Sequence, residues 1–413
     1  MADKNNGKMS GNKGEWSEIY IFLKLMNDGR VYAADKNMNK LKDVFLNIIK
    51  IIREEISNQK YEYYTGEKIN IFLNGEDVGP CVDVSEFEKY KNELWSVLKN
   101  SLKGNSITSD SVEEFLHSIH IQKLKAPAAK QSDFFGGTQD ITMEVMDFRS
   151  GINSVIGFSC KSDFTGKATL FNASKDNTNF LYEITGPMND QRMEKFNHTF
   201  VYRNKINKET KEKEQKADVA IKDRIRLLKE AGCDIEYKKM CAQNAERNLI
   251  LSGGMEMPII VGNMLKAYYW YGEGSAMFSS LTYALDYITK NNVASYPFDE
   301  LESLYRRKVG TLLYDMFTGM RLSKPWDGRS DVNGGYIVAK NDGDVVAYHS
   351  CISDEFKDFL VEQLGFESPS AGRHQYMSVF KEEGKYYLKF NLQIRFKGSN
   401  ITKSEWELDV ENV

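Results

Sequence analysis

An aspartate and a lysine are expected to meet across a β-hairpin in the middle of the chain. Apolar and polar residues alternate over Asp140–Met146 and again over Ser154–Lys161, and this period of two predicts two strands. A two-residue turn at Ser150-Gly151 would pair the strands so that Asp140 lies opposite Lys161. One face of the hairpin is then apolar, and the other carries the charged pair at its open end.

Two interpretations of this pair remain open. It can be an exposed cross-strand ion pair, which is a common surface feature. Alternatively, the carboxylate binds a hard divalent cation, while the lysine orients or helps to deprotonate a water and offsets charge on a pentavalent phosphate. The second arrangement is the chemistry of metal-assisted phosphodiester hydrolysis. Asp147 points to the opposite face of its strand, so we exclude it as the metal ligand.

Two glutamates near the N-terminus are candidates to complete such a metal site. Magnesium prefers six oxygen ligands, so a site built on one aspartate needs a second carboxylate. Glu15 and Glu18 lie three residues apart on one face of a helix predicted over Gly14–Lys24. Glu18 lies beside the apolar Phe22. A carboxylate in apolar surroundings generally needs a charged partner or a metal to stabilise it. A favourable charge at a helix N-terminus explains Glu15 equally well.

The elements that must position these residues fall into four regions. Helical periodicity covers Leu41–Ile56 and Glu86–Lys103, and a period of two appears only after residue 130. The expected regions are 1–130, mainly helical and carrying Glu15 and Glu18; 131–200, the hairpin and its core; 201–330, helical with a basic loop; and 331–413, β-rich.

Two later segments have their own signals. Arg203–Lys229 is rich in basic residues and is expected to be an exposed loop that enters a helix, either as a solvated charged surface or as a DNA contact. Tyr336–Ala339 and Val345–Tyr348 flank Asn341-Asp-Gly-Asp344, which predicts a second hairpin. A helical pattern follows over Asp354–Leu364.

Composition narrows the class of protein. The 413 residues carry a net charge of -4, which neither supports nor refutes nucleic-acid binding. Five scattered cysteines without a C-x-x-C pair argue against a disulfide framework and a zinc ribbon. Met1–Lys13 lacks an apolar signal core, and no run reaches the roughly 18–20 apolar residues of a membrane span. We therefore expect a cytoplasmic protein with no membrane partner.

Six short motifs follow one another along the chain: Gly11–Glu18, Asp140–Met143, Gly157–Ser162, Ala168–Lys175, Asn179–Tyr182 and Pro369–His374. In these motifs the sequence resembles the HpaII family of type II restriction endonucleases, which have the PD-(D/E)XK nuclease core. The resemblance implies an α/β (α+β) fold with a restriction-endonuclease-like mixed central sheet flanked by helices, a helical N-terminal part and a β-rich C-terminal part. It also implies a prokaryotic enzyme that needs Mg²⁺ and cuts double-stranded DNA at a short palindrome, CCGG in the type member, leaving 5′-phosphates.

The resemblance assigns roles around the hairpin. Asp140, Ser159 and Lys161 become the catalytic residues, and the Cys160 backbone carbonyl becomes a further metal ligand. Ser159 departs from the general nuclease pattern, which more often has Glu or Asp before x-Lys. Because a serine hydroxyl is a poor magnesium ligand, metal affinity must then come from Asp140, the Cys160 carbonyl, waters and a helix glutamate. The number of metal ions stays open.

DNA recognition is expected from two distant segments. Arg373 suits a bidentate contact with guanine, and His374 beside it can also reach base edges. Ordinary loop and helix-cap polarity explains Asn172 and Asn179 equally well. The full candidate set for groove edges or phosphates is Asn172, Ser174, Lys175, Asn179, Arg373 and His374.

Other functions are weighed against the nuclease. A sequence-specific DNA-binding protein of the same fold that has lost cleavage is the main alternative, and Ser159 is its argument. A phosphate loop at Gly166-Lys167-Ala168 fails, because Lys161 stands where a glycine is required and Ala168 where a Ser or Thr is required. The expected partners are double-stranded DNA and, functionally, a companion DNA methyltransferase that protects host DNA; a homodimer and a monomer both stay open.

Overall fold

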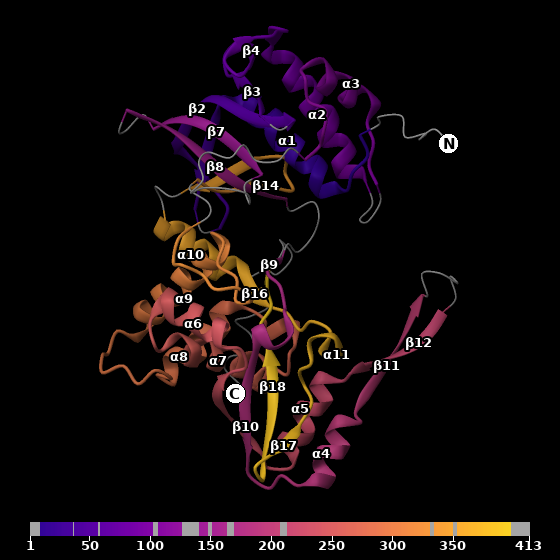
Figure 1. The fold of residues 1–413 in the computed structure, drawn as a ribbon, viewed down its shortest axis with the longest axis vertical. Coiled ribbons are helices and arrows are strands. Elements are labelled where there is room, and N and C mark those ends of the chain that lie inside the picture. Colours follow the sequence, from indigo (N-terminus) through magenta and orange to yellow (C-terminus); the bar gives the residue numbers. More distant parts are fainter. Residues whose placement is uncertain are drawn as a thin grey trace. The chain divides into compact units, whose positions relative to one another are not determined.

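The computed structural model describes residues 9–35, 37–56, 58–101, 106–125, 140–147, 151–162, 169–206, 213–330, 334–349 and 353–397. The chain divides into two units that each contain two segments of sequence (Figure 1). Unit 1 comprises Met1–Ala168 and Ser330–Phe359, and unit 2 comprises Thr169–Arg329 and Leu360–Val413. The fold is a mixture of α and β structure, as expected. No helix in the described ranges is long and apolar enough to cross a membrane.

Unit 1 is built on a mixed sheet that shows ten strands within the described residues. Its order is β1-β15-β14-β8-β7-β2-β3-β4-β5, with β6 beside β4. The β14 strand runs parallel to β8, whereas β7 and β8 are antiparallel. The strands are β1 (Arg30–Ala34), β2 (Lys40–Ile56), β3 (Gln59–Tyr64), β4 (Lys68–Leu73), β5 (Glu76–Asp77), β6 (Val82–Asp83), β7 (Ile141–Asp147), β8 (Ile152–Ser162), β14 (Gly335–Ala339) and β15 (Val345–His349).

Three helices, α1 (Lys13–Asp28), α2 (Val84–Asn100) and α3 (Asp110–Ser118), pack with the sheet of unit 1 (Figure 1). One hydrophobic core joins α1 to the apolar face of the β7–β8 hairpin, where Met143 and Phe158 are fully buried. The expected hairpins at 140–161 and 336–348 are confirmed, and so are the helices at α1, α2 and α10 (Ser353–Gln363).

The helix expected over Leu41–Ile56 is wrong, because these residues form the long strand β2. Ile48 and Ile51 are both buried, and the pairing with β7 shifts between Ile48 and Lys50. A bulge adds one residue and so turns the strand spacing of two into a spacing of three that imitates a helix. The isoleucine-rich composition itself favours a strand. The region 1–130 is therefore a mixture of helices and strands rather than mainly helical.

Unit 2 combines several helices with small sheets. Its sheets run β13-β10-β18-β17, β16-β19-β9 and β11-β12. The strands are β9 (Thr169–Phe171), β10 (Asn179–Thr185), β11 (Phe200–Ile206), β12 (Lys213–Val219), β13 (Asp234–Met240), β16 (Leu364–Phe366), β17 (Phe380–Glu382), β18 (Lys385–Asn391) and β19 (Ile394–Phe396). The helices are η2 (Lys175–Thr178), α4 (Asp190–Asn197), α5 (Ile221–Glu230), α6 (Gln243–Gly253), α7 (Met257–Lys266), η3 (Ala267–Tyr271), η4 (Ala276–Phe278), α8 (Leu281–Lys290), α9 (Leu301–Phe317) and α11 (Ala371–His374).

Two expectations for the second half of the chain need correction. The basic stretch Arg203–Lys229 is not a loop before its helix, since it contains most of the β11–β12 hairpin and α5. The β-rich C-terminal region does not form one body of its own: β14 and β15 complete the sheet of unit 1, and β16–β19 belong to unit 2.

Candidate active site

The β7–β8 hairpin places Asp140 opposite Ser159 rather than Lys161. Ile141 pairs with Phe158, and the Asp140 N–H donates to the Phe158 carbonyl at 2.9 Å. The expected register is wrong by two residues, because the connection between the strands, residues 148–151, is centred one residue before the expected turn at Ser150-Gly151. A shift of two residues preserves the faces of a strand. Asp147 lies at the other end of β7, paired with Ile152.

Two groups of β8 hold the Asp140 carboxylate. Its Oδ2 atom accepts hydrogen bonds from the Ser159 hydroxyl at 3.0 Å and from the Cys160 N–H at 2.7 Å. In the described part of the chain Oδ1 has no hydrogen-bond partner, so one oxygen is oriented and the other remains available. Ser159 therefore acts on the carboxylate as a donor. The Cys160 side chain is buried in the core, and burial raises the pKa of its thiol well above the usual value.

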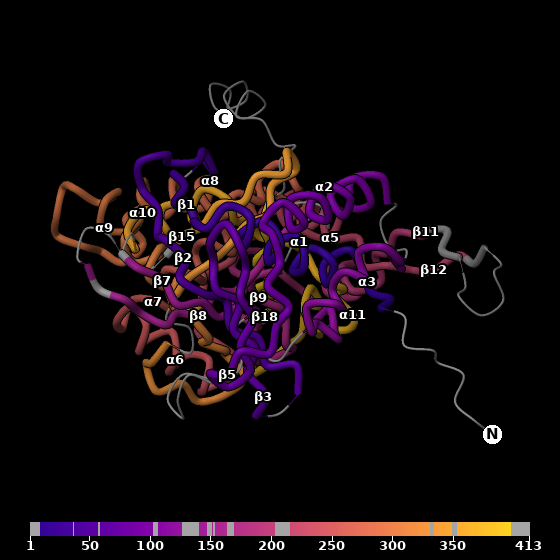
Figure 2. Tube along the Cα trace, turned by 90° about the horizontal axis from the view of Figure 1, so that it is seen from above, coloured from indigo at the N-terminus to yellow at the C-terminus, as the bar shows by residue number. Residues whose placement is uncertain are grey.

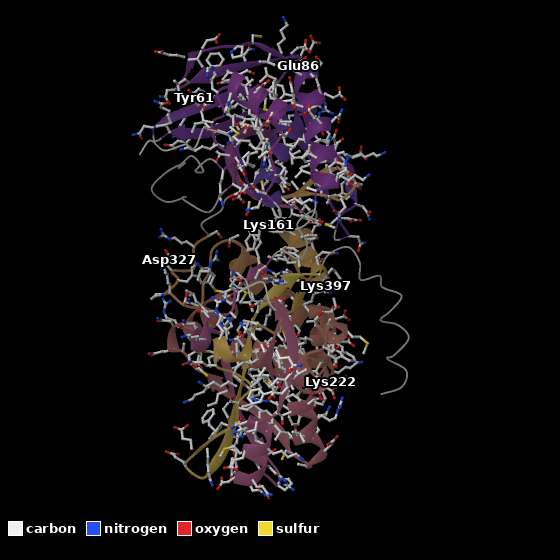
Figure 3. All side chains as sticks on the ribbon, turned by 90° about the vertical axis from the view of Figure 1, so that its right-hand side faces the viewer. Tyr61, Glu86, Lys161, Lys222, Asp327 and Lys397 are labelled. Carbon is white, nitrogen blue, oxygen red and sulfur yellow. The ribbon has the colours of Figure 1, made fainter. Side chains whose placement is uncertain are left out.

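Lys161 forms no ion pair with Asp140, and both residues lie within the described ranges, so the cross-strand ion pair weighed above is not present. Instead Lys161 lines a cavity of about 180 Å³ between α1 and β8. Figure 3 labels Lys161 at the opposite end of unit 1 from Tyr61 and Glu86. The cavity lining comes from Gly14, Ser17, Glu18, Ile21, Cys160, Lys161 and Ser162.

A direct contact between α1 and β8 sets the geometry of this cavity. The hydroxyl oxygens of Ser17 and Ser162 lie 3.0 Å apart in a hydrogen bond, and Ser17 also donates to the Lys13 carbonyl at 2.6 Å. Ser17 precedes Glu18, and Ser162 follows Lys161. The two hydroxyls therefore join the helix that carries the acid to the strand that carries the lysine. Sequence reasoning missed both serines, and no local signal pairs residues so far apart in the chain.

Glu18 lies in an unusual electrostatic environment. Burial raises the pKa of its carboxyl to about 7, and the negative charge of Asp140 adds to this effect. Lys125, Arg53 and Lys161 oppose it with their positive charges. A bound cation would offset the negative charge that raises the pKa of Glu18. The Glu18 carboxylate and the free Oδ1 of Asp140 fit Mg²⁺, which usually keeps several of its waters.

The other expected ligands are less well placed. The Glu15 carboxylate accepts from the Asn12 N–H at 2.8 Å, while the Asn12 side chain accepts from the Glu15 N–H at 3.1 Å. This reciprocal pair is a capping box that begins α1. Glu15 does not line the cavity. Across the described residues, no three His, Cys, Asp or Glu side chains gather as a metal site.

The two recognition segments expected from the sequence come together in unit 2. Lys175 in η2 and Arg373 in α11 are exposed, and His374 is half-buried. Burial lowers the pKa of His374, and the positive charges of Arg373 and Lys175 add to this effect. The three side chains therefore form one basic cluster, which we call the α11 cluster. Asn172 is exposed after β9.

Ser174 and Asn179 have structural contacts instead. The Ser174 N–H donates to the Thr178 hydroxyl at 2.8 Å. Asn179 is fully buried, and its amide donates to the His374 carbonyl at 3.0 Å and accepts from Asn391 at 2.6 Å. These bonds attach α11 to β10, so Asn179 supports the α11 cluster without reaching its surface. The Gly166-Lys167-Ala168 segment lies outside the described residues.

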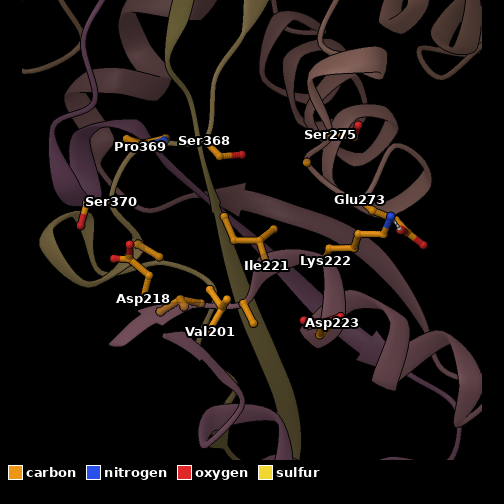
Figure 4. A pocket seen from close by; sticks show the side chains of 14 residues that line it. Val201, Asp218, Ile221, Lys222, Asp223, Glu273, Ser275, Ser368, Pro369 and Ser370 are labelled. Carbon is orange, nitrogen blue, oxygen red and sulfur yellow. Dashed lines mark ion pairs between the residues drawn. The ribbon is translucent and has the colours of Figure 1, made fainter. Parts of the chain in front are cut away.

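A second cavity, of about 610 Å³, lies within unit 2 between the base of the β11–β12 hairpin, the first turn of α5 and the loop before α11. Figure 4 shows Lys222 directed toward Glu273, and their charged atoms lie 3.7 Å apart. Asp218 and Asp223 also line it. Three carboxylates against one lysine disfavour a phosphate here.

Comparison with known proteins assigns the family. The model of a family described as HpaII restriction endonuclease matches residues 12–396. The type II restriction enzyme HpaII of Haemophilus parainfluenzae is 30% identical over 387 residues, which cover 94% of this chain and 98% of that protein. No solved structure matches the chain. The chain therefore belongs to the HpaII family of type II restriction endonucleases.

Proposed function

We propose that this restriction endonuclease hydrolyses both strands of duplex DNA in a Mg²⁺-dependent reaction that leaves 5′-phosphates, with a PD-(D/E)XK site formed by Asp140, Lys161 and Glu18. The observation that carries the proposal is that Glu18 and Lys161 line one cavity between α1 and β8, while Asp140 is hydrogen-bonded to Ser159 and Cys160 directly before Lys161. Family membership alone supports DNA cleavage at a specific site. The metal, the products and the residue roles are our inference.

Each residue has a distinct role in the proposed reaction. Asp140, oriented by Ser159 and the Cys160 N–H, and Glu18 would hold the metal through their carboxylates. The Cys160 carbonyl stays a proposed ligand. Lys161 orients the attacking water and offsets the charge that develops on the phosphate. A bound Mg²⁺ would supply Lewis-acid stabilisation of that charge.

The alternative of a DNA-binding protein without cleavage has less support. The argument for this alternative was that Ser159 cannot replace a carboxylate as a metal ligand. The Ser159 hydroxyl donates a hydrogen bond that orients Asp140, which is a role in an active enzyme. A serine at this position therefore does not imply loss of cleavage. We retain CCGG as the proposed target, together with a companion methyltransferase; a homodimer would let two copies cut the two strands of a palindrome.

Mapping the ends of a cleaved plasmid tests the proposal. Purified protein is incubated with a sequenced plasmid and Mg²⁺, and the termini are sequenced and tested for 5′-phosphates. Asp140→Ala should abolish cleavage, whereas Asp147→Ala, at the other end of β7, should remain active. Cleavage by Asp140→Ala together with inactivity of Asp147→Ala would show that the metal site is assigned to the wrong end of the hairpin.

A further inference from the structure

The β11–β12 hairpin extends from unit 2 as a two-stranded ribbon. In the described part of the chain, neither strand pairs with a third. The ribbon points away from the helices and the larger sheets of unit 2 in both views (Figures 1 and 2). A ribbon of two strands has little stability of its own in water, so its position depends on how its base is held.

A buried arginine holds that base. Arg224 of α5 is almost fully buried, and its guanidinium donates to the carbonyls of Thr199 at 3.0 Å and Met377 at 2.5 Å, and to that of Asn197. The same group lies 5.2 Å from the ring centroid of Phe200, the first residue of β11. Thr199 directly precedes the hairpin, and Met377 follows α11. One buried cation therefore ties the base of the ribbon to the segment that carries Arg373.

The composition of the ribbon suits a polyanion. Residues 200–219 contain six Lys or Arg against four Asp or Glu, although the whole chain has a net charge of -4. Lys216 of β12 is exposed. Tyr202 is 66% exposed. Cations with an exposed aromatic residue are typical of nucleic-acid contacts, and a two-stranded ribbon fits the major groove of B-DNA.

We propose that the β11–β12 hairpin is an arm that binds duplex DNA beside the α11 cluster. The inference rests on the proposed function, because it takes the substrate to be duplex DNA. Lys216 contacts a phosphate, and Tyr202 contacts sugar or base edges. The acidic cavity at the base of the ribbon disfavours phosphates, so the DNA backbone follows the strands of the arm rather than entering that cavity.

Salt-dependent binding tests the arm separately from cleavage. Equilibrium binding to a duplex with the mapped cleavage site and to a scrambled duplex is measured with Ca²⁺ in place of Mg²⁺, over a series of salt concentrations. Each phosphate contact contributes about 0.9 to the slope of log affinity against log salt. Lys216→Gln should reduce this slope by about 1 on both duplexes. The matched control Lys290→Gln, which removes one exposed cation of unit 2, should keep the wild-type slope.

Tyr202→Ala supplies an independent measurement. We expect it to lower affinity while leaving the salt slope unchanged, because it removes no charge. Wild-type slopes and affinities in both arm variants would overturn the inference, even if plasmid cleavage is normal. An arm variant that changes the oligomeric state in sedimentation with an unaltered salt slope would also overturn it and identify a second copy of the chain as the occupant. If the wild type neither binds nor cleaves DNA, the proposed function itself fails.

Discussion

At the residue scale, the two carboxylates of the proposed site have different surroundings. Asp140 accepts hydrogen bonds from two donors of β8. In contrast, burial and the negative charge of Asp140 raise the pKa of Glu18. Lys161 has neither acid as an ion-pair partner within the described residues, so its charge is available to a phosphate. The proposed site therefore contains carboxylates that a metal ion would neutralise and a lysine that a substrate phosphate would neutralise.

Lys161→Ala should abolish cleavage and leave binding largely intact. The lysine acts on the water and on charge that develops in the transition state, and loss of one such group costs at least about 100-fold in rate. Single-turnover cleavage with Mg²⁺ and binding with Ca²⁺ measure the two effects separately. Lys99→Ala, an exposed lysine of α2, is the control and should behave as wild type. Undiminished cleavage by Lys161→Ala would remove the lysine from the mechanism.

Glu18→Gln should weaken the metal site and stabilise the metal-free protein. Since the pKa of Glu18 rises from 4.5 to about 7 on folding, the folded state binds more protons within this range, and stability falls as the pH rises through it. At pH 8 without divalent metal the variant should gain roughly 1–2 kcal/mol, a figure discounted for solvent screening, and the gain should vanish below pH 4.5.

Thermal unfolding at several pH values checks the stability of Glu18→Gln, and a Mg²⁺ titration of cleavage checks its metal affinity. The Mg²⁺ concentration for half-maximal cleavage should rise more in Glu18→Gln than in Glu15→Gln, whose carboxylate caps α1. Identical Mg²⁺ titrations for wild type and Glu18→Gln would leave Glu18 a structural residue.

At the scale of elements, both proposed sites depend on a polar contact between segments far apart in sequence. In unit 1 the Ser17–Ser162 hydrogen bond joins α1 to β8. In unit 2 Asn179 joins β10 to α11, and Arg224 joins α5 to both the hairpin base and the segment after α11. Buried polar groups therefore decide where the elements that carry the proposed functional side chains lie.

Arg224→Met should destabilise unit 2 strongly. The substitution leaves three carbonyls without their donor, and each buried unpaired group costs about 1–3 kcal/mol. We expect a loss of at least about 3 kcal/mol, measured by chemical or thermal unfolding. Arg226→Met is the matched control on the same helix, because Arg226 is half exposed and its surface ion pairs contribute at most about 1 kcal/mol. Equal stability of the two variants would refute the anchoring role.

At the scale of the whole molecule, the proposed chemistry and the proposed recognition belong to different units. Asp140, Lys161 and Glu18 belong to unit 1, and the α11 cluster and the hairpin arm belong to unit 2. A magnesium site alone hydrolyses phosphodiesters without regard to sequence. Specific cleavage therefore requires that base contacts made by unit 2 favour the cleaving geometry in unit 1.

Arg373→Ala should reduce discrimination more than it reduces overall DNA affinity. A bidentate contact between arginine and guanine contributes about 1–3 kcal/mol of discrimination against a wrong base. Binding to the mapped site and to a scrambled duplex at the same salt concentration provides the measurement. We expect the mapped site to lose more affinity. An equal loss on both duplexes would make Arg373 a phosphate contact and move the specificity to other residues.

Local sequence determined the elements of the proposed nuclease site. The alternation of apolar and polar residues predicted β7 and β8 and the faces of Asp140 and Lys161, because a strand's period of two is a local property. The helical spacing around Glu18 predicted α1 for the same reason. Even the wrong register kept the faces correct, since an error of two residues does not change them.

Tertiary structure decided how these elements meet. The bulge in β2 gives this strand a helix-like spacing of three between buried residues. Such a spacing fits one face of a sheet only when the strand is paired with β7. The contact of Ser17 with Ser162, the burial of Asn179 and the approach of Lys175 to His374 join segments that are far apart in sequence. Such contacts depend on the packing of the whole core, and periodicity over a few residues contains no information about them.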